Sequence, residues 1–449
     1  MKGKVIIRVA LVSGGLIVAA ATVWAGKPVC GDGVCQGNET NTCPADCDPG
    51  PPPPPPPPPD PNLLTAFDGE DGSVFGEFGV ALLDDLDGDG HPDLAVGAPK
   101  VGVGKKQDQK NHGRVSVFSG ATHQLLFSLD GEERSQFGYD VAAAGDVDGD
   151  GIGDLVVGAP VFGTGNGRGP KLGKVYVYSG ATAQLLFAKT AAGSADVWLG
   201  RDVSTAGDVD GDGYADVIAG TRYAGHAYVW AGPDGARLLY DLQGPAGGEF
   251  GSSVGGGGDL DGDGVPDLVV GARSEGGAGV VRGFSGADGS QLFALQGEGD
   301  GDWFGSRVAV AGDVDLDGYD DVVIGAIQRG AVYVAAGPDA ARLLFVKYGP
   351  AGSGLGGSVS GAGDLDGDGY ADVLAGDPRI DDWRGAITVW AGPDGVRELF
   401  HRTGESSSDQ FGSAVAGGRD VDLDGFPDLL VSAPFWGDGG RAYLYSSQP

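Results

Sequence analysis

One nine-residue pattern, D-x-D-x-D-G-x-x-D, occurs seven times in the chain and constrains its fold more than any other feature. Ca²⁺ takes about 6–8 oxygen ligands, and carboxylates on alternate residues of a tight loop can converge on one ion. Glycine at position 6 suits the sharp bend of such a loop. The pattern therefore predicts up to seven Ca²⁺ ions. The predicted ligands, at positions 1, 3, 5 and 9 of the copies, are Asp85, Asp87, Asp89 and Asp93; Asp146, Asp148, Asp150 and Asp154; Asp208, Asp210, Asp212 and Asp216; Asp259, Asp261, Asp263 and Asp267; Asp313, Asp315, Asp317 and Asp321; Asp364, Asp366, Asp368 and Asp372; Asp420, Asp422, Asp424 and Asp428.

These loops differ from the EF-hand, which requires glutamate at position 12 and helices on both sides. Position 12 here is apolar, as at Val96 and Val157, and the flanking runs are rich in β-branched residues. The alternative is seven acidic turns without metal. Four crowded carboxylates repel one another strongly unless a cation neutralises them, so the sequence favours calcium.

The chain is strongly acidic, with a formal net charge of −34. The predicted ligands are 28 of its 63 acidic residues, and seven Ca²⁺ ions would leave a net charge of about −20. A protein of this charge is a poor candidate for binding nucleic-acid phosphates. Its 88 glycines follow no collagen period and favour short strands joined by tight turns.

The N-terminal part differs in composition from the rest. Residues 1–25 have a basic start, an apolar stretch and a small-residue cleavage site, as in a secretory signal, and an uncleaved membrane anchor is the alternative. Residues 26–49 are expected to form a small module with two disulfides, of unknown pairing, or less favourably a zinc site. Residues 50–61 are a proline-rich spacer. The cysteines of the module are Cys30, Cys35, Cys43 and Cys47.

Residues 62–449 carry the repeats, whose first aspartates are 51 to 62 residues apart. Units of this length with four strand-like runs are typical of β-propeller blades. In the second unit the strands are expected at residues 137–145, 155–157, 174–178 and 185–187. The first strand of each unit is rich in alanine and glycine, as expected where seven strands crowd one axis.

The two ends of this region predict how the ring closes. The chain stops after a third strand, at residues 441–445, while residues 62–67 resemble a fourth strand. We therefore expect residues 62–67 to complete blade 7, without a covalent bond because this region has no cysteine. The predicted fold is all-β: a monomeric, seven-bladed propeller of four-stranded antiparallel blades.

The pattern F-G…D-x-D-G-D-G-x-x-D-L-x-V-G-A-P resembles the FG-GAP repeat of integrin α-chain β-propellers and their bacterial relatives, over about residues 62–449. The resemblance implies seven blades with calcium in the first loop of the blade, on one face of the ring. Integrins carry this loop in only some blades, whereas all seven have it here. Leu199 and Leu355 replace the first phenylalanine in blades 3 and 6, and blade 1 has one inserted residue before Val80. The resemblance does not extend to receptor pairing.

The loops on the face opposite the calcium loops are where integrin propellers meet ligands. Two of these loops are basic and predict a patch for an acidic partner, with solvated, flexible loops as the alternative. Four tryptophans on this face would stack on sugars if exposed, or else pack between blades. The basic residues are Lys100, Lys105, Lys106, Lys110, Arg114, Arg168, Lys171 and Lys174, and the tryptophans are Trp198, Trp303, Trp383 and Trp436.

The sequence gives little support for an enzyme. Its five histidines are scattered, and it has neither a nucleophile-elbow motif nor a zinc-protease motif. We therefore predict a secreted or cell-surface adhesion module without catalytic residues, which binds an extracellular protein, matrix or polysaccharide and has no membrane span after signal removal. The alternatives are a calcium-stabilised lectin and, less favoured, a polysaccharide lyase.

Overall fold

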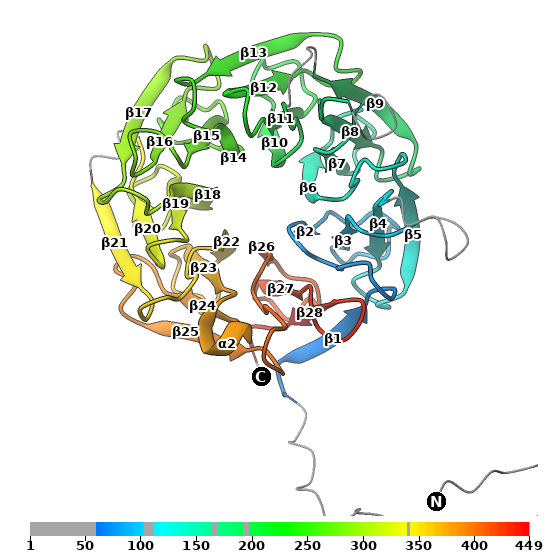
Figure 1. Ribbon diagram of the computed structural model, residues 1–449, viewed down its shortest axis with the longest axis vertical. Coiled ribbons are helices and arrows are strands. Elements are labelled where there is room, and N and C mark those ends of the chain that lie inside the picture. The colour runs from blue at the N-terminus through cyan, green and yellow to red at the C-terminus, as the bar shows by residue number, and fades with distance from the viewer. Residues whose placement is uncertain (1–59, 103–110, 164–168, 192–196, 339–341, 449) are drawn as a thin grey trace, which may run out of the picture. The chain divides into compact units, whose positions relative to one another are not determined.

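The repeat region is a seven-bladed β-propeller, as predicted. The computed structural model describes residues 60–102, 111–163, 169–191, 197–338 and 342–448. These residues belong to one compact unit, Asp60–Pro449, in which seven four-stranded antiparallel sheets surround a central axis (Figure 1). The expected signal, cysteine-rich module and proline run lie outside the described residues.

Each blade runs from an innermost first strand to an outermost fourth strand. The first strands are β2 (Val80–Leu82), β6 (Asp140–Gly145), β10 (Val203–Gly207), β14 (Phe250–Gly258), β18 (Phe304–Gly312), β22 (Ser358–Gly363) and β26 (Val415–Arg419). The second strands are β3 (Leu94–Ala98), β7 (Asp154–Ala159), β11 (Asp216–Gly220), β15 (Asp267–Ala272), β19 (Asp321–Ala326), β23 (Asp372–Asp377) and β27 (Asp428–Ala433). The third strands are β4 (Arg114–Phe118), β8 (Lys174–Tyr178), β12 (His226–Trp230), β16 (Val280–Phe284), β20 (Ala331–Ala335), β24 (Ala386–Trp390) and β28 (Arg441–Tyr445). The fourth strands are β5 (Leu125–Asp130), β9 (Leu185–Thr190), β13 (Leu238–Gln243), β17 (Gln291–Gln296), β21 (Leu343–Tyr348), β25 (Glu398–Thr403) and, for blade 7, β1 (Leu63–Asp68).

The hydrophobic core lies between neighbouring blades. Every residue of the second strands is buried, because both faces of each sheet are covered by adjacent sheets. Seven buried clusters each join two consecutive blades, including the last and the first. Large third-strand residues such as Trp230 belong to these clusters. Burial of apolar area between blades is therefore the main stabilising term of the ring.

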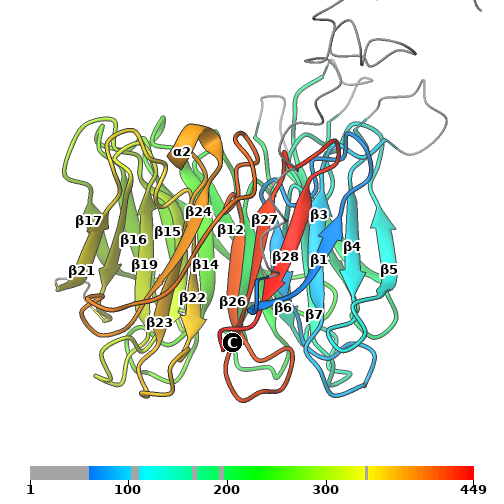
Figure 2. The same ribbon diagram turned by 90° about the horizontal axis from the view of Figure 1, so that it is seen from below.

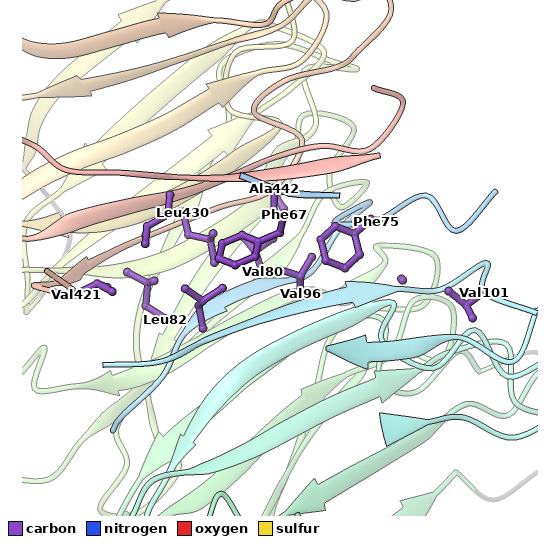
Figure 3. Packing of buried hydrophobic residues seen from close by; sticks show 13 residues of the cluster. Phe67, Phe75, Val80, Leu82, Val96, Val101, Val421, Leu430 and Ala442 are labelled. Carbon is purple, nitrogen blue, oxygen red and sulfur yellow. The ribbon is translucent and has the colours of Figure 1, made fainter. Parts of the chain in front are cut away.

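Ring closure occurs where the sequence places it. Strand β1 pairs antiparallel with β28, with Phe67 opposite Ala442. Phe67 is 6% exposed and belongs to the cluster that joins blades 7 and 1 (Figure 3). Just before β1, the Asp60 carboxylate accepts a hydrogen bond of 2.6 Å from Nε of Arg402 on β25. This contact and the strand pairing close the ring without a covalent bond.

The predicted bounds of two strands in blade 2 were wrong by three residues. The first strand begins at Asp140 rather than at residue 137, because Gly138 has a φ of +73° and Phe137 forms only an isolated bridge to Gly113 of blade 1. The fourth strand continues to Thr190 rather than ending at residue 187. The F-G pair in this blade therefore packs on the preceding blade instead of extending its own strand.

The two faces of the ring carry different loops. The predicted calcium loops connect first to second strands at one end, and the loops from second to third and from fourth to first strands lie at the other (Figure 2). The short helical segment α2 (Ile380–Trp383) belongs to the second group. Within the described part of the chain, no helix has the length and apolar character needed to cross a membrane.

Candidate metal centres

All seven aspartate loops have the same backbone geometry. Glycine at position 6 has a φ between 85° and 97° in every copy, a region that disfavours residues with a Cβ. Its N–H donates to the carboxylate of position 1 at 2.8–3.0 Å in every copy. The carboxylate of position 5 accepts from the N–H of position 7 in the same way. The glycine that the sequence marked is therefore required by the loop conformation.

The predicted ligands converge within the loops. In groups of three, their carboxylate oxygens lie within 4.8 Å of one another. Two further groups of this kind occur among the described residues. Oxygens at this spacing suit a hard cation such as Ca²⁺, which binds them at about 2.3–2.6 Å. The groups in blades 1 to 5 are Asp85, Asp87 and Asp93; Asp146, Asp148 and Asp154; Asp208, Asp210 and Asp216; Asp259, Asp261 and Asp263; and Asp313, Asp315 and Asp321.

The position-9 aspartate has a second role that the sequence did not reveal. In blade 4, Oδ2 of Asp267 accepts from the N–H of Leu260 at 2.7 Å, and Oδ1 accepts from the N–H of Gly286 at 2.8 Å. Gly286 lies in the turn between the third and fourth strands. The same pair of bonds occurs in blades 1 to 6. This aspartate therefore holds the calcium loop to the neighbouring turn.

The electrostatics of position 9 favour a bound cation. Asp267 is fully buried, and burial, with a smaller contribution from Asp261, raises its pKa to about 6. In blade 7, burial and the carboxylate of Asp422 raise the pKa of Asp428 to about 7. In the part of the chain that the structure describes, no turn follows the third strand of blade 7, and Oδ1 of Asp428 is buried without a hydrogen-bond partner. A divalent ion would supply the missing partner and offset the repulsion, so these residues fit calcium.

Two substitutions in the aspartate loop of blade 4 distinguish the structural role of position 9 from calcium binding. Asp267→Asn leaves one backbone N–H facing an amide NH₂, and we expect it to lower the free energy of unfolding by about 2 kcal/mol even in EDTA. Asp263→Asn, at the exposed position 5, should weaken calcium binding with little effect in EDTA. Thermal unfolding with and without calcium measures both. Equal losses in EDTA would contradict a separate structural role for position 9.

Blades 3, 5 and 6 share a feature that the other loops lack. Each has the turn A-G-P-D-x-x-R, and its arginine forms an ion pair with a position-3 carboxylate of the adjacent loop. Blades 1 and 2 have glutamine at this place in the turn, Gln124 and Gln184, and blade 4 has Ser290. An arginine beside the ligands competes electrostatically with a bound cation. The pairs are Arg237 with Asp210, Arg342 with Asp315, and Arg397 with Asp366.

We therefore expect two classes of calcium site. The triple substitution Arg237→Gln, Arg342→Gln and Arg397→Gln introduces the residue that blades 1 and 2 have at this place. Because these arginines are more than half exposed, the gain in calcium affinity should be modest, about two- to fivefold in three sites. Calorimetric titration counts the sites in each class. Unchanged binding in the triple variant would show that the arginines swing away from the ions.

The opposite face does not carry the predicted basic patch in its described part. Lys100 pairs with Glu77 at 2.8 Å and Lys174 pairs with Glu132 at 2.6 Å. Arg114 is the first residue of β4 and pairs with a carboxylate across the strands, at 2.6 Å from Asp130. The partners come from other segments of the chain, so the charges are compensated locally. The remaining basic residues of the prediction include Lys105, Lys106, Lys110 and Arg168, which lie outside the described residues.

The four tryptophans lie on this face, as predicted, and each contacts an arginine. Arg441 lies over Trp436 at 3.3 Å and Arg273 over Trp303 at 4.4 Å, measured to the ring centroids. Trp198 and Trp383 have longer contacts of the same kind. Of the four, Trp383 is the most open, at 47% exposed. Guanidinium groups therefore occupy ring faces that a sugar would need, which weakens the lectin interpretation.

Comparison with known proteins identifies the repeats. The FG-GAP repeat family matches residues 78–118, 137–178 and 411–445, and the FG-GAP-like repeat family matches residues 208–270. The aligned segments of three integrin α-chains span about a fifth of those relatives. Integrin alpha-5 of Xenopus laevis is 34% identical over an alignment that covers 45% of this chain and 20% of that protein. For integrin alpha-8 of Mus musculus the identity is 33%, over 43% of this chain and 19% of that protein. For integrin alpha pat-2 of Caenorhabditis elegans it is 33%, over 44% of this chain and 18% of that protein.

Proposed function

Because the chain is an FG-GAP repeat protein similar to the propellers of integrin α-chains, we propose that it is an extracellular adhesion or recognition module. In this proposal Ca²⁺ ions rigidify the loop between the first and second strands of every blade. The ligand, a protein or matrix component, binds the opposite face. The ring itself performs no chemical step.

The separation of the two faces carries the proposal. All seven aspartate loops lie at one end of the ring, each anchored by a buried position-9 carboxylate. Their conformations are nearly identical, as expected of a structural device. The loops at the other end differ in length and sequence from blade to blade. Variable loops on a rigid scaffold are where binding residues concentrate.

We further propose that the chain is exported. The signal-like residues 1–25, the four cysteines within residues 26–49 and a calcium-dependent ring all suit an oxidising environment outside the cell. Mass spectrometry of the protein from its native source tests this. We expect a mature chain beginning near Gly26 and an unreduced mass lighter by four hydrogens than the reduced mass. A retained N-terminus would indicate the anchor alternative.

Capture of ligands in the presence and absence of calcium tests the proposed function. The full chain is immobilised and exposed to surface or matrix proteins from its natural surroundings. We expect specific proteins to be retained in calcium and released by EDTA. No retention in calcium would contradict the proposal, and retention that EDTA leaves unchanged would contradict the role of the metal. A glycan array run in parallel reports the carbohydrate alternative.

A further inference from the structure

A cavity of about 280 Å³ lies on the face opposite the aspartate loops. Phe78 and Arg307 line both this cavity and a second one, of about 230 Å³, which is lined by residues from all seven first strands and so follows the ring axis. The first cavity is therefore the mouth of the central channel. In a chain of net charge −34 it is lined by four arginines, Arg201, Arg273, Arg307 and Arg379, and by one carboxylate, Glu77, which pairs with Lys100 at 2.8 Å.

The repeat places some of these arginines at fixed positions. The two residues that follow each F-G or L-G pair lie at the start of the first strand, where the strands meet the channel mouth. They are Glu77 and Phe78 in blade 1, Tyr139 and Asp140 in blade 2, Arg201 and Asp202 in blade 3, and Ser306 and Arg307 in blade 5, but serine, glycine or alanine in blades 4, 6 and 7. These two positions vary while the repeat around them is kept, so they determine the charge of the mouth.

Arg201 is buried and has no ion-pair partner among the described residues. It is 8% exposed, and its Nη1 atom has no hydrogen-bond partner. The guanidinium lies 4.9 Å from the ring centroid of Tyr139 and 5.3 Å from that of Phe78. Cation–π contacts compensate only part of the cost of burying a charge. An arginine in this state is the feature of the cavity that most requires a partner.

The acidic groups near Arg201 do not pair with it directly. Asp202 accepts hydrogen bonds from Ser253 Oγ at 2.7 Å and from the N–H of Val254 at 2.8 Å, and its nearest approach to Arg307 is 3.7 Å. Burial, and then the charge of Asp202, raise the pKa of Asp140 well above its usual range. Arg307 and Arg201 act in the opposite direction on this pKa. Among the described residues neither Asp140 nor Asp202 forms an ion pair with Arg201, and Asp202 is at 3.7 Å from Arg307.

The other two arginines differ in their partners. Nε of Arg273 pairs with Glu249 at 2.7 Å. Arg379 lies over the ring of Trp383 and donates to a neutral acceptor, Oε1 of Gln328, at 3.2 Å. Among the described residues no carboxylate lies within ion-pair distance of Arg379. Arg201 and Arg379 thus present two uncompensated guanidinium groups to one cavity, a donor arrangement suited to a carboxylate.

The surrounding face selects against a polyanion. Asp381 and Asp382 are exposed beside the cavity in the same loop as Trp383. A uronic-acid chain or sulfated glycan lying across the ring would meet these charges. A single acidic side chain at the tip of a loop would reach the arginines and avoid most of the repulsion.

From the cavity, its uncompensated arginines and its acidic surroundings, we propose that the channel mouth is a receptor for one aspartate or glutamate side chain presented by a partner protein. This site rests on the proposed recognition function and names its ligand chemistry. The carboxylate would accept hydrogen bonds from Arg379 and Arg201, with the side chains of Trp303 and Trp383 beside it.

Two short peptides test the site on the full, calcium-loaded chain. The probes are acetyl-Gly-Ser-Glu-Ser-Gly-amide and its glutamine counterpart, with binding followed by calorimetry and by tryptophan fluorescence. We expect the glutamate peptide to bind at least tenfold more tightly. Arg379→Gln and Arg201→Gln should each weaken its binding at least tenfold, and Arg379→Lys should weaken it less. Arg134→Gln, an exposed arginine of the same face outside the cavity, should leave binding unchanged.

The remaining outcomes overturn the proposal. Equal binding of the two peptides, or no binding of either, would show that the mouth does not recognise a carboxylate. Acetate binding as tightly as the peptide would assign the site to a small metabolite. Tighter binding of an oligogalacturonate, lost in Arg379→Gln, would assign it to a polysaccharide. Calcium-dependent capture that is unaffected in both arginine variants would refute this site while leaving the proposed function intact. Because Arg379 is only half-buried, its variants keep the test valid if Arg201→Gln fails to fold.

Discussion

Removing divalent ions with EDTA is expected to lower the melting temperature of the propeller by roughly 12 °C. At a free calcium concentration ten times Kd, each site stabilises the folded chain by about 1.4 kcal/mol, so seven independent sites contribute about 10 kcal/mol. Unfolding of the 390-residue unit Asp60–Pro449 has an entropy of about 2.1 cal/mol/K per residue. The ratio of the two quantities gives the expected shift. Differential scanning calorimetry with and without calcium measures it.

Two controls make this result specific. Magnesium should restore less of the lost stability, because it prefers a smaller, octahedral site. Replacing Asp259 and Asp261 by asparagine should remove about one seventh of the calcium-dependent shift, since it disables one loop and leaves the position-9 anchor in place. A melting temperature that is the same in EDTA and in calcium would refute the structural role of the ions.

Deleting residues 60–68 should prevent the ring from folding as a monomer. The deletion removes β1, exposes the edge of β28 and opens the cluster that contains Phe67. The loss in the free energy of unfolding is comparable with the whole net stability of a typical domain, which is about 5–15 kcal/mol. An unpaired edge strand also promotes association. Light scattering after size exclusion should show aggregates or exchanged dimers in place of the monomer.

Milder variants distinguish ring closure from general damage. Phe67→Ala should cost about 3–5 kcal/mol because it opens a cavity at the seam. Leu125→Ala alters an outer strand as well, but Leu125 is 54% exposed and its loss should have little effect. Removing residues 1–59 should leave the melting temperature unchanged. A stable monomer after deletion of residues 60–68 would refute closure by β1.

Repetition made the fold and the candidate metal loops predictable from the sequence. Seven copies of one pattern fixed the number of blades, and a last unit without a fourth strand pointed to residues 62–67 as its completion. The strand bounds were less accurate because Gly138 bends the chain before Val141. That bend depends on contact with the previous blade, and local preference does not encode it.

The channel mouth could not be predicted, because it has no local signature. Arg201 and Arg379 are distant in sequence and line the same cavity only once the ring has closed. For the same reason the sequence did not reveal that Lys100 and Lys174 form ion pairs: their partners, Glu77 and Glu132, come from segments that only the folded ring places nearby. The arginines of the repeated turn A-G-P-D-x-x-R could be seen in the sequence. That their side chains point to the position-3 aspartates of three candidate metal loops could not.

The contact between Asp60 and Arg402 has a mechanical consequence. Any tension transmitted through the chain that precedes the ring reaches it first at Asp60. The guanidinium of Arg402 donates two hydrogen bonds, of 2.6 and 3.1 Å, to the Asp60 carboxylate. The load then divides between blade 6, which carries Arg402, and the pairing of Leu63 with Tyr445 in blade 7. In a ring held by its N-terminal segment, β1 would therefore stay paired with β28 until the contact between Asp60 and Arg402 breaks.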